Sequence, residues 1–179
     1  QREFPHAVFA LEEKQSSYAA RNKGIALSRG EIIAFTDADC IPAPDWLACG
    51  AAALSAAPGC GLLGGRIEIF FAAAQHPSAL ELYEAFWAFP QETFLSYSKF
   101  GATANVFTWR RVLDDAGFFD DSLQSGGDHE WGNRVHAAGY KLVYSASTIV
   151  QHPARASFRE IRLKLERVET GIVQVELKQ

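Results

Sequence analysis

Short apolar runs alternate along this chain with longer segments in which apolar residues recur at helical spacing. The short runs predict strands at 6–11, 31–36, 62–71, 141–144 and 148–151, with extended structure around 102–108. The longer segments predict helices at 16–28, 46–56, 77–89, 110–117, 128–139 and about 157–178. Strands that alternate with helices predict an α/β layer fold with a largely parallel sheet. No repeat or linker interrupts the pattern, so we expect a single domain over 1–179.

Residues that favour helix ends lie where this pattern places them. Ser16 or Ser17 can cap the first predicted helix, and Gly30 follows it as a C-terminal stop. Gly117 and Gly139 follow two later helices in the same way. The helix limits therefore have local support beyond the apolar pattern.

Composition narrows the possible functions and location of the protein. The formal net charge is −4 and the pI about 5.7, which does not fit a nucleic-acid-binding surface. No run of about eighteen apolar residues and no basic-then-apolar leader pattern is present, so we expect a soluble, cytoplasmic chain. Cys40, Cys49 and Cys60 lie at wide, unpatterned spacing, which argues against a zinc site and against a disulfide framework.

Two carboxylates, Asp37 and Asp39, follow the predicted strand at 31–36. Ligands of open parallel sheets collect at the carboxyl ends of strands, and alternation along an extended segment would point both side chains the same way. Two hard oxygen ligands there suit Mg²⁺ or Mn²⁺ held together with a diphosphate. The alternative is a solvated turn without a ligand.

A second group of polar residues begins the predicted helix at 128–139, in the segment Gly126-Gly127-Asp128-His129-Glu130-Trp131. Asp128 is either a helix cap or, beside a glycine-lined opening, a general base for a hydroxyl. A helix start would keep its pKa low. Glu130 and Arg134 are spaced for an intrahelical ion pair, and Trp131 is either core or a platform for a sugar.

Two further polar features are ambiguous when taken alone. The segment Arg21-Asn22-Lys23-Gly24 could simply be the polar face of a helix. His152 follows a predicted strand and is either structural or a neutral-imidazole metal ligand.

In this order, these segments resemble the family 2 glycosyltransferases of the GT-A fold, from about residue 18 to 167. The segments that carry the resemblance are Ala20-Arg21-Asn22-Lys23-Gly24, Ile33-Ala34-Phe35-Thr36-Asp37-Ala38-Asp39, Pro44-Asp45-Trp46-Leu47, Ala102-Thr103-Ala104-Asn105-Val106-Phe107, Gly117-Phe118-Phe119-Asp120, Gly126-Gly127-Asp128-His129-Glu130-Trp131, Ala138-Gly139-Tyr140-Lys141-Leu142 and His152. The resemblance implies a Rossmann-like, mostly parallel sheet flanked by helices. It also implies transfer of a sugar from a nucleotide-sugar donor with the help of Mn²⁺ or Mg²⁺.

The resemblance further implies a role for each matching position. Asp128 would be the catalytic base. The donor would contact Arg21, Asn22, Gly24, Asp37 and Asp39. The metal would be held by Asp39 with Asp37 and His152, and the acceptor would contact Asn105, Glu130 and Trp131.

The sequence departs from the family pattern at three points, and these departures limit what the resemblance implies. The family's first strand and its second strand, which ends in Asp-Asp-Gly-Ser, together hold the nucleotide base and have no counterpart here, so donor identity is not implied. We therefore expect an open sheet edge, with either self-association through that edge or an altered local fold. The Gln-x-x-Arg-Trp motif of processive members is also missing, which favours addition of a single sugar. Gly127-Asp128 stands at the expected Glu-Asp pair, which keeps the base.

The implied chemistry is one inverting displacement onto a glycan or lipid-linked acceptor, in polysaccharide or glycoconjugate biosynthesis. A phosphohydrolase of the haloacid-dehalogenase type is a rival, disfavoured because Cys40 and Ile41 follow Asp39. A catalytically incompetent sugar-nucleotide-binding or scaffold domain is the other alternative.

The predicted terminal helix carries a regular apolar stripe, made of Ile161, Leu165, Val168, Ile172 and Val175. Basic residues flank it. The favoured interpretation is docking on the domain or on a second subunit. The alternative is a helix lying on an anionic membrane, near a lipid-linked acceptor.

Overall fold

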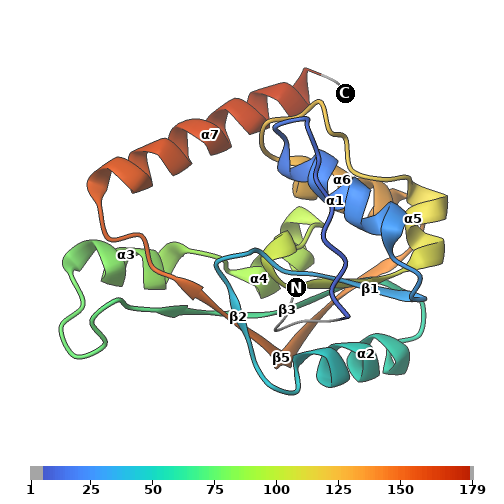
Figure 1. Ribbon diagram of the computed structural model, residues 1–179, viewed down its shortest axis with the longest axis horizontal. Coiled ribbons are helices and arrows are strands. Elements are labelled where there is room, and N and C mark those ends of the chain that lie inside the picture. Colours follow the sequence, from blue (N-terminus) through green and yellow to red (C-terminus); the bar gives the residue numbers. More distant parts are fainter. Residues whose placement is uncertain (1–5, 178–179) are drawn as a thin grey trace.

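The computed structural model describes residues 6–177 and contains a five-stranded sheet of order β1-β4-β3-β5-β2 (Figure 1). The strands are β1 (Ile32–Phe35), β2 (Ile41–Pro42), β3 (Cys60–Phe70), β4 (Val106–Trp109) and β5 (Lys141–Pro153). β3 and β5 are parallel, whereas β4 is antiparallel to both of its neighbours and β2 is antiparallel to β5. The sheet is therefore mixed.

The expectation of a largely parallel sheet is wrong for these pairings, although β1, β3 and β5 share one direction. An apolar pattern locates a strand but does not fix its direction, which depends on the path of the connecting segments. Here β4 enters between β1 and β3 from the opposite end.

The helices are α1 (Ser17–Leu27), α2 (Trp46–Ala56), α3 (Ala79–Trp87), α4 (Gln91–Thr93), α5 (Arg110–Ala116), α6 (Gly127–Ala137) and α7 (Phe158–Glu176). A π-helical turn, η1 (Phe94–Ser98), and a 3₁₀ turn, η2 (Thr103–Asn105), complete the set of described elements. Ser16 caps α1 through the N–H of Ala19, as predicted, and Ser157 caps α7 in a capping box with Glu160. α1 ends at Leu27, within one residue of the predicted end, but its C-cap is Ser28 rather than Gly30.

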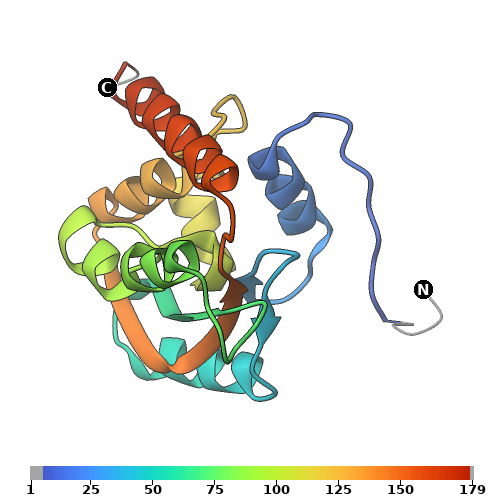
Figure 2. The same cartoon turned by 90° about the vertical axis from the view of Figure 1, so that its left-hand side faces the viewer.

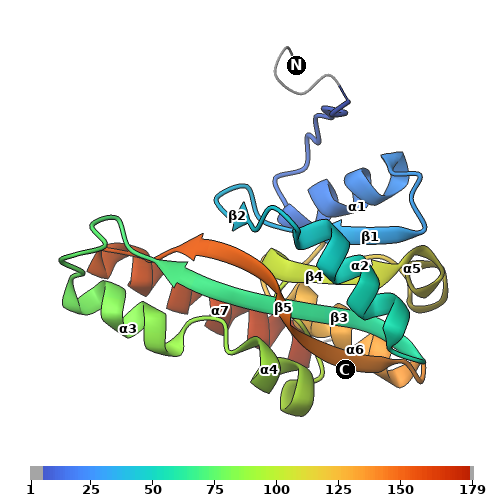
Figure 3. The same ribbon diagram turned by 90° about the horizontal axis from the view of Figure 1, so that it is seen from below.

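Helices cover both faces of the sheet, as the views from the front and from below show (Figures 1 and 3). α2 covers one face, where its buried side chains pack on β3, β4 and β5 through Trp46, Leu54, Leu63, Phe107 and Val150. α1, α5 and α6 form the second core on the other face, around residues that include Ile25, Phe35, Val112, Leu113 and Trp131. The candidate site residues follow β1, lie near the end of β5 and lie in the first turn of α6.

Residues 6–11, predicted as a strand, do not form one. They run as an extended segment that stands apart from the body before α1 (Figure 2). Val8, Phe9 and Leu11 are 77%, 65% and 82% exposed. An apolar run becomes a strand only where a neighbouring strand supplies its hydrogen bonds, and no described strand lies beside this one.

Two further features of the sheet bear on the predictions. The strands expected at 141–144 and 148–151 are one strand, β5, with an irregularity where Ser145 pairs with Gly65 and Ile149 with Arg66. β1 is an edge strand, and no described strand pairs with its free side. The expected open edge is therefore present, while self-association through it stays a prediction.

The terminal helix α7 contacts the domain through its two ends. Ile161 and Val175 are buried, whereas Leu165, Val168 and Ile172 of the same stripe are between 39% and 52% exposed. The predicted docking on the domain is thus confirmed at both ends of the helix and absent along its middle. No helix among residues 6–177 is both long and apolar enough to cross a membrane.

α3 has an inverted distribution of polar and apolar side chains. Its two glutamates are buried, whereas Leu82, Tyr83, Phe86 and Trp87 are between 47% and 76% exposed. Glu81 accepts hydrogen bonds from the backbone N–H groups of its capping box and of the preceding loop.

The other buried glutamate, Glu84, joins three segments of the chain. It forms ion pairs with Arg155, which follows β5, at 2.7 Å, and with Lys164 of α7 at 2.9 Å. Burial alone would raise the pKa of Glu84, but hydrogen bonds and charge from the two cations outweigh it and lower the pKa. The start of α7 is therefore tied to α3 by charge.

Glu84→Gln is expected to lower the free energy of unfolding by about 1–3 kcal/mol, because Arg155 and Lys164 stay partly buried without a counter-charge. Since the folded pKa is depressed, this stabilisation is present above the ordinary carboxyl pKa and is lost as pH falls through the lower folded value. Urea unfolding measures it, with Glu166→Gln as an exposed, ion-paired control. Equal losses in the two variants would contradict the prediction.

Candidate active site

The chain turns sharply after β1, and this turn separates the two predicted carboxylates. The N–H of Cys40 donates to the carbonyl of Asp37 at 3.1 Å. Asp37 is ion-paired with Arg21 of α1 at 2.7 Å, whereas Asp39 faces β5 with its side chain 58% exposed. The expected alternation of both carboxylates on one side is wrong, because Asp39 lies in a turn rather than in an extended segment.

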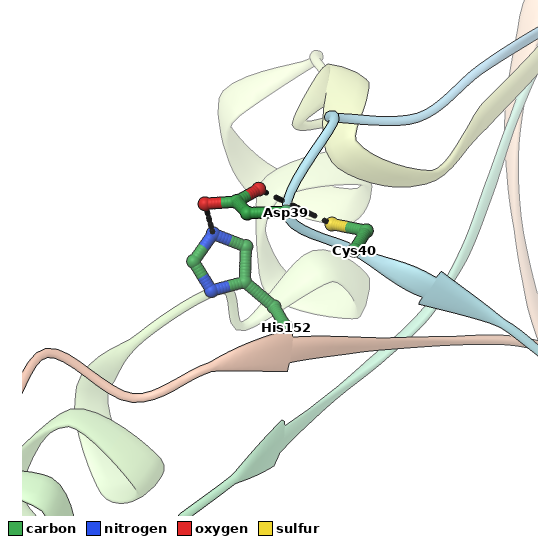
Figure 4. A group of neighbouring side chains, drawn as sticks. All are labelled: Asp39, Cys40 and His152. Carbon is green, nitrogen blue, oxygen red and sulfur yellow. Dashed lines mark hydrogen bonds and ion pairs between the residues drawn. The ribbon is translucent and has the colours of Figure 1, made fainter. Parts of the chain in front are cut away.

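Asp39, Cys40 and His152 form a group whose possible ligand atoms all lie within 4.8 Å of one another (Figure 4). Asp39 Oδ2 lies 3.8 Å from His152 Nε2, and the Cys40 sulfur lies 3.9 Å from Asp39 Oδ1. Asp37 is not a member of this group. The structure therefore brings together two of the three predicted metal ligands, Asp39 and His152, and adds Cys40.

The pairing of β2 with β5 explains why these residues meet. Ile41 pairs with Gln151 in antiparallel register, so one further step along the strands places Cys40 opposite His152. Side chains at opposite positions of an antiparallel pair lie on the same face. The sequence argument against a zinc site considered the cysteines only with one another and not with a distant histidine, so it did not cover this group.

His152 is 4% exposed, and its orientation is fixed by its neighbours. Nδ1 lies 2.7 Å from the Pro153 carbonyl, which can only accept, so in the neutral ring Nε2 has a free lone pair on the Asp39 side. The Phe89 ring packs on the imidazole at 4.7 Å, and Lys164 Nζ lies 5.7 Å from the Phe89 centroid. An Nδ1–H donated to a carbonyl is the arrangement by which metal-binding histidines present Nε2.

Asp128 lies in the first turn of α6 and is half-buried. Gly126 is the N-cap and no side chain caps the helix, so the alternative of Asp128 as a helix cap is wrong. Burial is the largest influence on the Asp128 pKa and raises it, while Arg21 and the backbone N–H of Thr103 offset part of the rise. The expected low pKa is therefore wrong, because desolvation outweighs the helix dipole.

The two glycines before Asp128 allow close packing and do not open a path for an acceptor. Gly126 has φ +77°, and a Cβ there would lie 3.3 Å from the Gly171 carbonyl of α7. A Cβ on Gly127 would lie 2.7 Å from the Tyr18 ring. The predicted glycine-lined opening is thus filled by Tyr18 and α7.

Arg21 and Tyr18 of α1 complete the surroundings of Asp128. Arg21 lies between two carboxylates, since it pairs with Asp37 and its charge also lowers the pKa of Asp128. The Tyr18 hydroxyl accepts a hydrogen bond from the Gly127 N–H at 2.8 Å. Burial, together with the charge of Asp128, raises the pKa of Tyr18 to about 12, so this hydroxyl keeps its proton at neutral pH. Sequence reasoning missed Tyr18, whose only signal was its position one turn before Arg21.

The other predicted donor residues lie on α1 with different surroundings. Asn22 donates to the Phe119 carbonyl at 2.8 Å and accepts from the Phe119 N–H at 3.1 Å, so its amide holds the α5–α6 connection. Gly24 lines two hollows beside α1, of about 450 Å³ and 290 Å³. Arg21 also lines the smaller of these, which lies along β1. Arg21 and Gly24 thus face open space, whereas Asn22 does not.

Asn105, predicted to contact the acceptor, has every side-chain hydrogen-bonding group engaged within the protein. Its Oδ1 accepts from Trp46 Nε1 at 2.9 Å. Its Nδ2 donates to the carbonyls of Arg66 and Thr148, both at 2.9 Å, and the residue has no exposed surface. Asn105 in this structure therefore joins β3, β5 and α2 rather than facing a ligand.

Glu130 and Trp131, the other predicted acceptor residues, are also engaged by the protein. Glu130 forms the expected ion pair with Arg134, at 2.6 Å and 2.8 Å. Trp131 is fully buried and donates from Nε1 to the Gly117 carbonyl at 2.9 Å. Of the two interpretations of Trp131, the structure supports a core side chain rather than a platform for a sugar.

The chain is similar in sequence to known glycosyltransferases. Residues 2–117 match the model of glycosyl transferase family 2. The curated Glycosyltransferase AglE of Haloferax volcanii is 40% identical over 168 residues, which cover 94% of this chain and 54% of that protein. The chain thus spans about half the length of this relative.

Two solved structures share the fold. The mannosyltransferase PcManGT from Pyrobaculum calidifontis, in complex with GDP-Man and Mn²⁺, matches with a TM-score of 0.66 and 18% identity over 93% of this chain and 44% of its own. GalNAc-T7 with UDP, GalNAc and Mn²⁺ matches with a TM-score of 0.62 and 21% identity over 84% of this chain and 32% of its own. These likenesses confirm the α/β class and the GT-A fold. The family model, which matches more than half of the chain, shows that the chain belongs to glycosyltransferase family 2.

Proposed function

We propose that this chain is the catalytic part of a metal-dependent glycosyltransferase, which transfers a single sugar from a nucleotide-sugar donor to an acceptor hydroxyl. The observation that carries the proposal is the presence of two chemically distinct acidic positions. Asp39 faces the imidazole of His152, whereas Asp128 is a half-buried carboxylate whose pKa is influenced by the charge of Arg21. The two similar structures support it, because they hold GDP-Man with Mn²⁺ and UDP and GalNAc with Mn²⁺.

Asp39 and His152 are the residues we assign to a divalent cation. Asp39 supplies the hard oxygen that Mg²⁺ or Mn²⁺ accepts, and His152 supplies an oriented nitrogen. Mg²⁺ strongly prefers oxygen ligands, so the imidazole favours Mn²⁺. When bound, such a cation supplies Lewis-acid stabilisation of the charge on a leaving diphosphate.

Asp128 is the residue we assign as the base that removes the proton from the acceptor hydroxyl. One displacement at the anomeric carbon then inverts its configuration without a covalent enzyme intermediate. Because burial raises the pKa of Asp128, its carboxylate is a stronger base than an exposed one would be. Arg21 keeps the site from accumulating uncompensated negative charge, since Asp37 lies on its other side.

A donor assay with the full-length protein tests the proposal. Release of nucleoside diphosphate from GDP- and UDP-sugars is expected with Mn²⁺ and not in the presence of a chelator. The anomeric configuration of the product, read by NMR, tests inversion. Binding of a nucleotide-sugar without turnover on any acceptor would favour the scaffold alternative.

We also propose that the acceptor is a glycan or lipid-linked molecule of cell-surface biosynthesis, met at the inner face of the membrane. The support is the apolar face of α3, which exposes Leu82, Tyr83, Phe86 and Trp87 and has no exposed charged side chain. Aromatic residues of this kind favour the boundary between lipid and water. α7 begins beside α3, at the Glu84–Lys164 ion pair, and adds the half-exposed apolar stripe and exposed arginines.

Phe86→Ser with Trp87→Ser is expected to lower co-sedimentation of the full-length protein with anionic vesicles about tenfold, because buried apolar area is lost. Tyr97→Ser removes an equally exposed aromatic from η1 and serves as the control. Equal recovery with anionic and neutral vesicles, or unchanged binding of the double variant, would contradict the membrane proposal.

A further inference from the structure

The group of Asp39, Cys40 and His152 contains a soft ligand that the proposed transferase chemistry does not use. A thiolate does not suit Mg²⁺ or Mn²⁺, which prefer oxygen. A thiolate, an imidazole nitrogen and a carboxylate together are instead the ligand types that Zn²⁺ takes in proteins. The three residues therefore form one candidate cation site, at which hard and soft ions are expected to bind with different affinities.

The separations are somewhat wider than those of a tetrahedral site with a bound cation. With metal–ligand bonds of about 2.0–2.3 Å, ligand atoms of such a site lie about 3.3–3.6 Å apart. One ligand atom from each of the three residues can be chosen so that all lie within 4.8 Å of one another. Asp39 reaches its two partners with different oxygens, at 3.8 Å from Oδ2 to His152 Nε2 and 3.9 Å from Oδ1 to the Cys40 sulfur, so a cation would draw the side chains closer together. The side chain of Asp39 is 58% exposed, which leaves solvent on one side of the group. Its exposure also leaves room for a fourth ligand from solvent.

Two of the three ligands already face the group in the folded protein before any cation binds. The Pro153 carbonyl holds the proton of His152 on Nδ1 and so presents Nε2 to the group. Cys40 is held opposite His152 by the β2–β5 register. The other cysteines have different environments, since Cys60 is buried in the α2 core and Cys49 lies against Asp45. Cys40 is thus the one cysteine of residues 6–177 placed beside a histidine and a carboxylate.

We propose that Asp39, Cys40 and His152 bind a thiophilic divalent cation, with Zn²⁺ the foremost case, in the absence of donor. Its consequence for activity rests on the proposed function: Zn²⁺ held there occupies the position assigned to Mn²⁺ and inhibits transfer. Binding itself needs neither donor nor acceptor. It replaces the thiol proton of Cys40, which leaves to solvent, by a sulfur–metal bond.

Cobalt is the probe that tests the ligand set, because a thiolate bound to Co²⁺ gives a charge-transfer absorption in the near ultraviolet that oxygen and nitrogen ligands do not. We expect this band when Co²⁺ is added to the tag-free, reduced full-length protein, and its loss on addition of Zn²⁺. Cys40→Ser is expected to abolish it and to weaken Zn²⁺ binding by at least about tenfold. Cys49→Ser is the matched control and keeps the band.

Far-UV circular dichroism of Cys40→Ser establishes that the variant is folded, which its half-exposed position favours. A band that persists in Cys40→Ser, or wild-type protein that binds Co²⁺ without the band, would overturn the proposal. Zn²⁺ inhibition of transfer should likewise weaken in Cys40→Ser when Mn²⁺ is held constant, and unchanged inhibition would count against the shared position. A cobalt–thiolate band in a protein without turnover would overturn the proposed function alone.

Discussion

Asp128→Asn in the full-length protein is expected to lower transfer by about 10²-fold or more, a typical contribution of general-base catalysis. The amide cannot take the acceptor proton. Folding and donor binding are expected to be retained, because Arg21 keeps its ion pair with Asp37 and the variant removes a charge from a half-buried position. Single-turnover transfer, donor affinity and thermal unfolding measured together separate the loss of chemistry from a loss of structure.

The pH profile adds a second readout of the same residue. Below its pKa the carboxyl of Asp128 is protonated and cannot act as a base, so wild-type transfer rises with pH through that value. Because burial raises the pKa, this limb lies above the usual range of a carboxyl group. Asp128→Asn should lose this rise of transfer with pH. Asp114→Asn, which alters an exposed carboxylate of α5, should keep both the rise and the wild-type rate of transfer. Intact turnover in Asp128→Asn rules out the assignment.

Asp39→Asn is expected to weaken Mn²⁺ binding and to lower transfer by about 10²-fold at limiting Mn²⁺, since even outer-shell changes at metal sites cost 10–100-fold. The neutral amide loses the charge that attracts the cation, although its shape is unchanged. Electron paramagnetic resonance of Mn²⁺, with and without nucleoside diphosphate, measures the affinity. Excess Mn²⁺ should restore part of the rate.

Asp45→Asn is the control for this experiment. Asp45 is the N-cap residue of α2 but makes no side-chain cap hydrogen bond, and Asn is as good an N-cap residue as Asp. It should bind Mn²⁺ and transfer sugar as the wild type does. Full activity of an Asp39→Ala protein without added metal would show that Asp39 holds no essential cation.

Elements fixed by local interactions could be predicted from the sequence. α2 has the predicted limits of 46–56, and α7 begins after Ser157, because an N-cap side chain acts within one turn. β1 and β3 were found through apolar runs of strand length. The Glu130–Arg134 ion pair follows from helical spacing alone.

Features that depend on distant partners could not be predicted in this way. Cys40 meets His152 only because a two-residue strand pairs with β5, and so short a strand has no sequence signal. The pKa of Asp128 depends on side chains from α1 and on burial, whereas its sequence neighbours suggested only a helix dipole. Asn105 resembles a ligand-binding position in sequence, yet its bonds to three separate segments are visible only in the fold.

The shortness of β2 has a consequence for how this protein should be handled. One of its two residues is Pro42, which has no N–H to donate, so the turn that carries Asp39 and Cys40 is held to β5 by few hydrogen bonds and can open locally. A cation bound by both that turn and His152 would oppose this local opening. A ligand that binds only the closed, folded form adds about 2.7 kcal/mol at one hundred times its dissociation constant. The apparent melting temperature would then vary with the cation content of the buffer, and chelator carried over from purification would lower it.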